Sequence, residues 1–96
     1  MFESRTTAST VCYSVSAEAD PGLLPRLIGH LAKVGLVPAR LHVTTHDGEM
    51  AVDLQVADLP AERAALLEQR FRTTVGVQWV ACDRKVALAA DEASLF

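Results

Sequence analysis

Residues 18–22, Glu-Ala-Asp-Pro-Gly, join a predicted strand to a predicted helix. They contain the groups of this chain that are best suited to bind a small ligand. If Gly22 caps that helix, Pro25 falls in its first turn, where the missing backbone donor costs little. The helix then starts with unpaired backbone N–H groups that can accept a carboxylate, and Asp20 can take an ammonium. We therefore predict a ligand-binding site composed of Asp20, Pro21, Gly22, Leu23 and Leu24.

The same residues also have a purely structural interpretation, which the sequence leaves open. An aspartate before Pro-Gly often shapes a turn or caps a helix. Gly22 can likewise be present only because the backbone needs a glycine there, without contacting a ligand. Gly35 is interpreted as the residue that ends the helix.

A second candidate site contains two histidines and a carboxylate. His42, His46 and Asp53 are predicted to project from one face of a hairpin, and such side chains can bind zinc. Residues four apart on a strand are separated by about 13 Å, however, which is too far to share one metal ion. We predict an exposed polar face and no metal.

Cys12 and Cys82 do not form a Cys-x-x-Cys pair, so neither a zinc ribbon nor a thioredoxin-like redox site is indicated. They lie on strands predicted to be neighbours, which makes a disulfide geometrically conceivable. In a cytoplasmic protein we expect no disulfide.

The chain offers no Ser/His/Asp set, phosphate-binding glycine loop or pair of carboxylates at catalytic spacing, so we predict no enzymatic activity and no cofactor. Its 96 residues suit one domain, and a net charge of -3 argues against nucleic acid as a partner. No apolar run is long enough for a membrane helix and no secretory signal is readable, so a cytoplasmic protein is predicted.

The elements that must position these residues follow from hydrophobic periodicity. Residues 10–17 alternate as a strand does, and residues 77–83 form a last strand whose inward face stays open between Val77, Trp79 and Ala81 on one side and Val80 and Cys82 on the other. Two amphipathic helices are predicted, one at 23–34 and one at 60–72 with Asp58 as its cap. The first carries the apolar stripe Leu24, Leu27, Ile28, Leu31 and Val34, with Arg26, His30 and Lys33 away from it; the second carries Ala64, Leu67 and Phe71.

Asp47-Gly48 is a strong signal for a two-residue hairpin turn between strands 41–46 and 49–56. That turn pairs His46 with Glu49, and the pairing continues residue by residue to Leu41 with Leu54.

The order strand, helix, strand, strand, helix, strand predicts an α+β ferredoxin-like βαββαβ domain with both helices on one face of a four-stranded antiparallel sheet. We expect the domain at residues 10–84, an N-terminal extension at 1–9 and a tail at 85–96, loose or a short helix. The uncovered sheet face would present Cys12, Ser14, Ser16, His42, Thr44, Ala51, Asp53 and Gln55. A homodimer through this face, or through the edge at 41–46, would complete the structure.

The chain resembles the ACT domain, a small amino-acid-sensing module, and is most similar to the version in the regulatory (small) subunit of acetolactate synthase. The likeness rests on Gly22, Leu24, Arg26, Ile28, Gly29 and Gly35, followed by Leu41-His42-Val43. It implies a regulatory protein that binds an amino acid between subunits at the first strand-to-helix turn and modulates a catalytic partner such as acetolactate synthase. The alternative is an interaction module of the same fold without a ligand.

This chain departs from those subunits at two positions of the turn and helix end. Where they tend to carry asparagines, it has Ala19 and Val37. Asp20 and the helix start are then the groups left to take the amine and the carboxylate of an amino acid.

Overall fold

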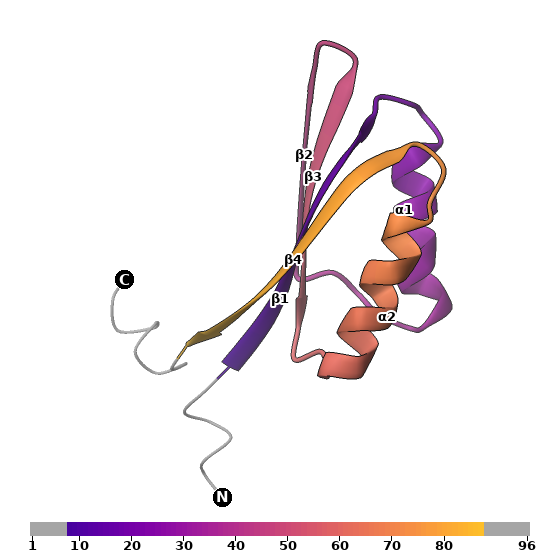
Figure 1. The fold of residues 1–96 in the computed structure, drawn as a ribbon. Helices are drawn as coiled ribbons and strands as arrows, with labels where there is room; N and C mark the ends of the chain where they lie inside the picture. Colours follow the sequence, from indigo (N-terminus) through magenta and orange to yellow (C-terminus); the bar gives the residue numbers. More distant parts are fainter. Residues whose placement is uncertain (1–7, 88–96) are drawn as a thin grey trace, which may run out of the picture.

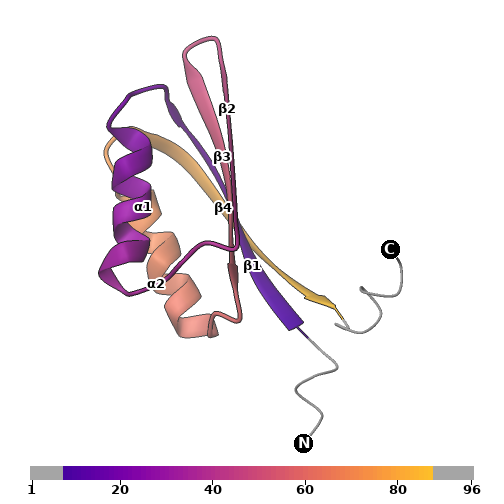
Figure 2. The ribbon, with the colours of Figure 1, turned by 180° about the vertical axis from the view of Figure 1, so that it is seen from behind.

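The computed structural model describes residues 8–87 and confirms the predicted ferredoxin-like fold. An antiparallel sheet with strand order β2-β3-β1-β4 carries both helices on one face (Figures 1 and 2). The elements are β1 (Ala8–Glu18), α1 (Leu23–Lys33), β2 (Arg40–His46), β3 (Glu49–Ala57), α2 (Ala61–Arg72) and β4 (Val77–Ala87). Strands β1 and β4 extend beyond the expected domain limits, so Val86 belongs to β4 and not to a tail. The tail prediction for 88–96 lies outside the described residues.

The hairpin has the register that the sequence predicts, from His46 opposite Glu49 to Leu41 opposite Leu54. Asp47 and Gly48 both adopt positive φ angles, 51° and 79°. Such a turn matches the right-handed twist of the two strands, and it sets every later pair along β2 and β3.

One hydrophobic core lies between the sheet and the helices. The inward residues of β1 are buried as predicted, and α2 buries Ala64, Leu67 and Phe71. Helix α1, in contrast, buries Leu23, Leu27 and Leu31, while Leu24 and Ile28 pack at the margin of the core. The buried face is therefore centred on the line Leu23, Leu27 and Leu31, so the predicted stripe was right for Leu27 and Leu31 and missed Leu23.

The structure settles which face of β4 points inward. Val80 lies opposite Val15 and is buried, whereas Trp79 lies opposite Ser16 on the uncovered face. The register shifts next to Ser16, so Val77 returns to the core side opposite Ala17. This bulge places Val77 and Trp79 on opposite faces, although a regular strand would put them on one face.

Cys12 and Cys82 are free thiols on opposite faces of neighbouring strands. Cys12 lies opposite Asp83 and Cys82 lies opposite Tyr13, whose side chain is in the core. The two thiols are therefore separated by the sheet, so the idea that a disulfide is geometrically conceivable was wrong.

Asp58 does not cap α2. Pro60 occupies the cap position, and Asp58 instead has a positive φ of 53° and donates its backbone N–H to Ser9 O at 2.9 Å.

Helix α2 is linked to the sheet by Tyr13 of β1. The Tyr13 hydroxyl donates to Ala64 O at 2.7 Å, and its ring packs edge-on against Phe71 with the ring centroids 5.1 Å apart.

Candidate functional site

The turn between β1 and α1 is organised around the carboxylate of Asp20. Leu23 donates its backbone N–H to Asp20 O at 3.0 Å, and Gly22 donates its N–H to Asp20 Oδ2 at 3.2 Å. Gly22 is the N-cap residue of α1, as predicted, and Pro25 lies in the first turn. The N–H groups of Gly22 and Leu23 are thus paired with Asp20, so the expectation that these two groups are unpaired was wrong.

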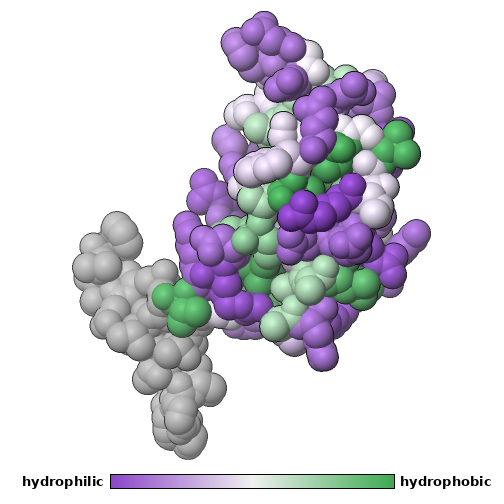
Figure 3. Space-filling model, in the orientation of Figure 1, coloured by the Kyte–Doolittle hydropathy of each residue, from purple (hydrophilic) through white to green (hydrophobic). Residues whose placement is uncertain are grey.

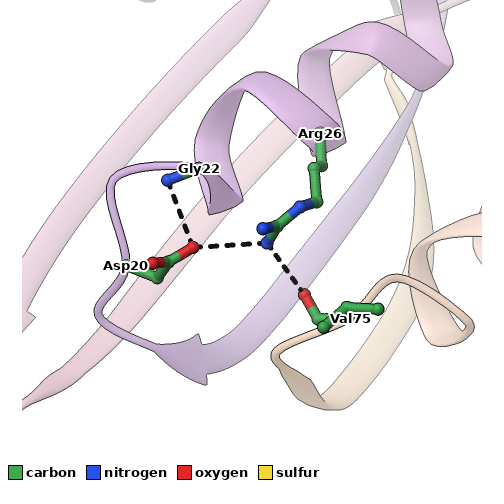
Figure 4. Close-up of polar contacts among 4 residues, drawn as sticks. All are labelled: Asp20, Gly22, Arg26 and Val75. Carbon is green, nitrogen blue, oxygen red and sulfur yellow. Dashed lines mark hydrogen bonds and ion pairs between the residues drawn. The ribbon is translucent and has the colours of Figure 1, made fainter.

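Arg26 connects this turn to a second loop. Its Nη1 lies 3.3 Å from Asp20 Oδ2 and donates to Val75 O at 3.2 Å (Figure 4). Both charged side chains remain close to half exposed, 44% for Arg26 and 45% for Asp20. Solvent and dissolved ligands therefore have access to the ion pair.

Gly22 leaves space for the close approach of that pair. A Cβ atom at this position would lie 3.0 Å from Nη2 of Arg26 and 3.2 Å from Oδ2 of Asp20. Its φ of −84° is open to any residue, so the space that it leaves, and not its backbone conformation, explains the glycine.

Neighbouring loops hold the turn in place at one end of the sheet. Ala19 donates its N–H to Gly48 O at 2.9 Å, in the β2–β3 turn, and Glu18 donates to Gly76 O at 3.0 Å, in the α2–β4 loop. The β1–α1, β2–β3 and α2–β4 connections therefore lie at the same end of the sheet (Figure 1).

The five predicted ligand residues differ in how far their side chains are exposed to solvent. Asp20 and Pro21 are exposed, and Gly22 and Leu24 are partly buried. The side chain of Leu23 is fully buried in the core, so only its backbone lies at the turn. A ligand role for these residues stays a prediction.

Sequence reasoning missed Arg26 as a site residue. It lies on α1 one turn after the cap, and its contact with Val75 joins residues 49 apart in the chain. The only local signal for the Asp20–Arg26 pair is a cationic residue placed one helical turn after the Asp-Pro-Gly turn.

The uncovered face of the sheet has a shallow hollow of about 430 Å³ near its centre. Small side chains, including Cys12, Ser14 and Ala81, form its floor, and charged residues border it. Ser14 donates its hydroxyl to Asp53 Oδ1 at 3.2 Å, and His42 lies opposite Asp53, as predicted. Within residues 8–87 no group of three potential metal ligands is found.

The edge strand β2 is exposed at every position except the partly buried Val43. Large exposed hydrophobic side chains are scattered over several elements, namely Val37, Leu41, Leu66, Val75, Trp79 and Val86. From the side shown in Figure 3 the surface mixes hydrophilic residues with small separate hydrophobic patches. Neither helix in the described part of the chain is long and apolar enough to cross a membrane.

Comparison with known proteins supports the fold. Residues 4–89 match a family model described as an ACT-like domain. No curated protein sequence matches the chain.

Several solved structures share the fold at low sequence identity. The ACT domain from GTP pyrophosphokinase of Chlorobium tepidum has a TM-score of 0.68 and 16% identity, over 77% of this chain and 96% of that one. An ACT domain protein from Streptococcus pneumoniae has a TM-score of 0.57 and 16% identity, over 92% and 98%. An uncharacterised protein from Thermotoga maritima has a TM-score of 0.66 and 9% identity, over 80% and 96%.

Proposed function

The chain belongs to the family of ACT-like domains, and we propose that it is a non-catalytic regulatory protein that binds a small amino acid at the β1–α1 turn. We propose further that it acts as a homodimer that modulates a catalytic partner.

The Asp20–Arg26 pair is the observation that supports an amino-acid ligand. A free amino acid has an ammonium and a carboxylate a few ångströms apart, and this turn presents the complementary charges side by side. Arg26 uses Nη1 for both of its contacts, while a guanidinium has five N–H donors. The remaining donors can receive the ligand carboxylate while Asp20 receives its ammonium.

The exposed apolar residues Ala19 and Val37 are relevant to the type of amino acid that binds and to the position of a second subunit. Ala19 is exposed beside Asp20, and Val37 is 81% exposed. The small side chain of Ala19 beside the charged pair suits an amino acid with an aliphatic side chain, whereas Val37 follows the opposite end of α1 from that pair. The exposed edge of β2 is where a second copy can extend the sheet, because an unpaired strand edge offers free backbone donors and acceptors.

The catalytic partner that we propose is the large subunit of acetolactate synthase. The support is the resemblance of the segment containing Gly22, Arg26, Gly29 and Gly35 to the regulatory subunits of that enzyme. The rival function is an interaction module without a ligand, which the internal pairing of Asp20 with Gly22 and Arg26 favours.

Calorimetric titration of the purified protein with each of the twenty amino acids tests the ligand proposal. We expect saturable binding of at least one aliphatic amino acid, and its loss in Asp20→Asn. Asp83→Asn is the matched control, because Asp83 borders the hollow on the sheet face away from the turn. Absence of binding by the wild-type protein overturns the sensor function.

Co-purification with the catalytic subunit of acetolactate synthase separates the two functions. Complex formation that responds to the bound amino acid supports a sensor. Complex formation in the absence of any amino-acid effect supports the interaction module.

A further inference from the structure

A second cleft lies between α1 and the α2–β4 loop, apart from the residues predicted to bind an amino acid. Its volume is about 320 Å³, which is within the range of small-molecule sites. The lining residues are Arg26, Gly29, His30, Lys33, Thr73, Thr74 and Val75. Arg26 lies between this cleft and Asp20, and the other six residues belong to the cleft alone.

The helix side of the cleft is a single stripe of α1. Arg26, Gly29, His30 and Lys33 are spaced by three and four residues, so they share one helical face. Gly29 is the position in this stripe without a side chain, and a Cβ built there meets no atom within 4 Å. Glycine in a helix interior is less favourable than alanine, and no neighbour in the structure requires it. Its effect is to leave the floor of the cleft open.

The charge in the cleft is positive. Arg26 and Lys33 contribute cations, and the lining residues include no carboxylate. Arg70 on α2 adds a further positive charge that acts on His30. The carboxylate nearest to these cations in the hydrogen-bond network is Asp20, which engages only Nη1 of Arg26.

His30 has a fixed orientation and one unused nitrogen. Thr74 donates its only hydroxyl proton to Arg70 O at 2.8 Å, so it must accept from His30 Nε2, which lies 2.9 Å from Thr74 Oγ1. In the neutral ring, Nδ1 then carries a lone pair, and it is buried with no hydrogen-bond partner. Burial, followed by the charges of Lys33 and Arg70, lowers the pKa of His30.

We propose that this cleft binds a small oxyanion, the phosphate or carboxylate group of a metabolite, through Lys33 and the free donors of Arg26. The anion offsets the positive charge around His30 and favours its protonated form. The site shares Arg26 with the turn proposed for an amino acid, whereas Gly29 and Lys33 belong to the cleft alone. Substitutions at Gly29 and Lys33 therefore test this site separately.

Amide NMR titration of the full chain with inorganic phosphate is the test, with chloride at equal ionic strength as reference. We expect saturable shifts at Gly29, His30 and Val75 and a rise in the pKa of His30. Lys33→Gln should bind about tenfold more weakly, which is the loss expected for one charge-assisted contact. Lys85→Gln is the matched control, because Lys85 borders the hollow on the opposite sheet face.

Two substitutions at Gly29 separate charge from shape. Gly29→Asp places a carboxylate in open space and should abolish phosphate binding, whereas Gly29→Ala should retain most of it. A parallel titration with succinate tells whether a carboxylate ligand is accepted in place of phosphate. If neither probe gives saturable shifts, or if Lys33→Gln and Gly29→Asp bind as the wild type does, the proposal is wrong.

Discussion

Arg26 Nη1 lies 3.3 Å from Asp20 Oδ2 and 3.2 Å from Val75 O, so one guanidinium joins the start of α1 to the loop that precedes β4. These contacts span the site proposed for an amino acid and the neighbouring cationic cleft. The position of this side chain therefore bears on both ligand proposals.

Arg26→Gln should separate stability from ligand binding. The lost ion pair is solvent-exposed, so we expect the free energy of unfolding to fall by only about 0–1 kcal/mol, while amino-acid binding is lost. Calorimetry and urea unfolding measure the two effects. Arg72→Gln is the control, because it removes an exposed pair with Glu68 (2.7 Å) on α2. Amino-acid binding unchanged in Arg26→Gln would remove Arg26 from the site.

Gly22→Ala should lower ligand affinity, whereas Gly29→Ala should raise the stability of the same helix. At Gly22 the new methyl group meets Arg26 Nη2 at 3.0 Å and displaces the Asp20–Arg26 pair, so ligand affinity should fall. At Gly29 the methyl group meets nothing, so the helix should gain about 0.5–1 kcal/mol. Thermal unfolding and calorimetry of both variants check this. Equal amino-acid affinities in the two variants would mean that the space at Gly22 has no role in the site.

The hairpin and β1 could be predicted because their signals are local. Asp47-Gly48 specifies a turn type, and the turn type specifies the register up to Leu41 opposite Leu54. Strict alternation along β1 likewise identifies the buried side chains of Val11, Tyr13 and Val15. Both inferences need only residues that are neighbours in the sequence.

The features that escaped prediction depend on contacts between distant residues. The bulge beside Ser16 puts Val77 on the core side of β4 although Trp79 faces away from the core. The carbonyl of Val75 helps to orient Arg26, and Thr74 draws His30 toward α2 although the helical pattern places it away from the core. Neither contact leaves a signal in the spacing of residues along α1.

Tyr13→Phe should destabilise the domain by about 1–2 kcal/mol, because Ala64 O loses a buried donor. The variant should also alter the response to alkaline pH. Burial, followed by the charges of Cys82 and Glu68, raises the pKa of Tyr13 above its ordinary value of 10.0. The stabilising contribution of the protonated phenol is therefore fully present below pH 10.0 and declines as the pH rises beyond it. Urea unfolding at a series of alkaline pH values should show a smaller decline for Tyr13→Phe than for the wild type, and identical slopes would contradict this assignment.

His30→Gln should reduce the loss of stability on acidification. The folded protein favours the neutral ring, because burial and then the charges of Lys33 and Arg70 lower the pKa of His30 below 6.5. Its contribution is present above pH 6.5 and is lost as the pH falls through the lower folded value. We expect thermal unfolding in phosphate-free buffer between about pH 7 and pH 5 to show a shallower decline for His30→Gln than for the wild type. His46→Gln serves as control, because the side chain of His46 is 90% exposed in the hairpin turn region. If the two variants respond alike to acid, the position of His30 against Thr74 and α2 has no influence on its titration.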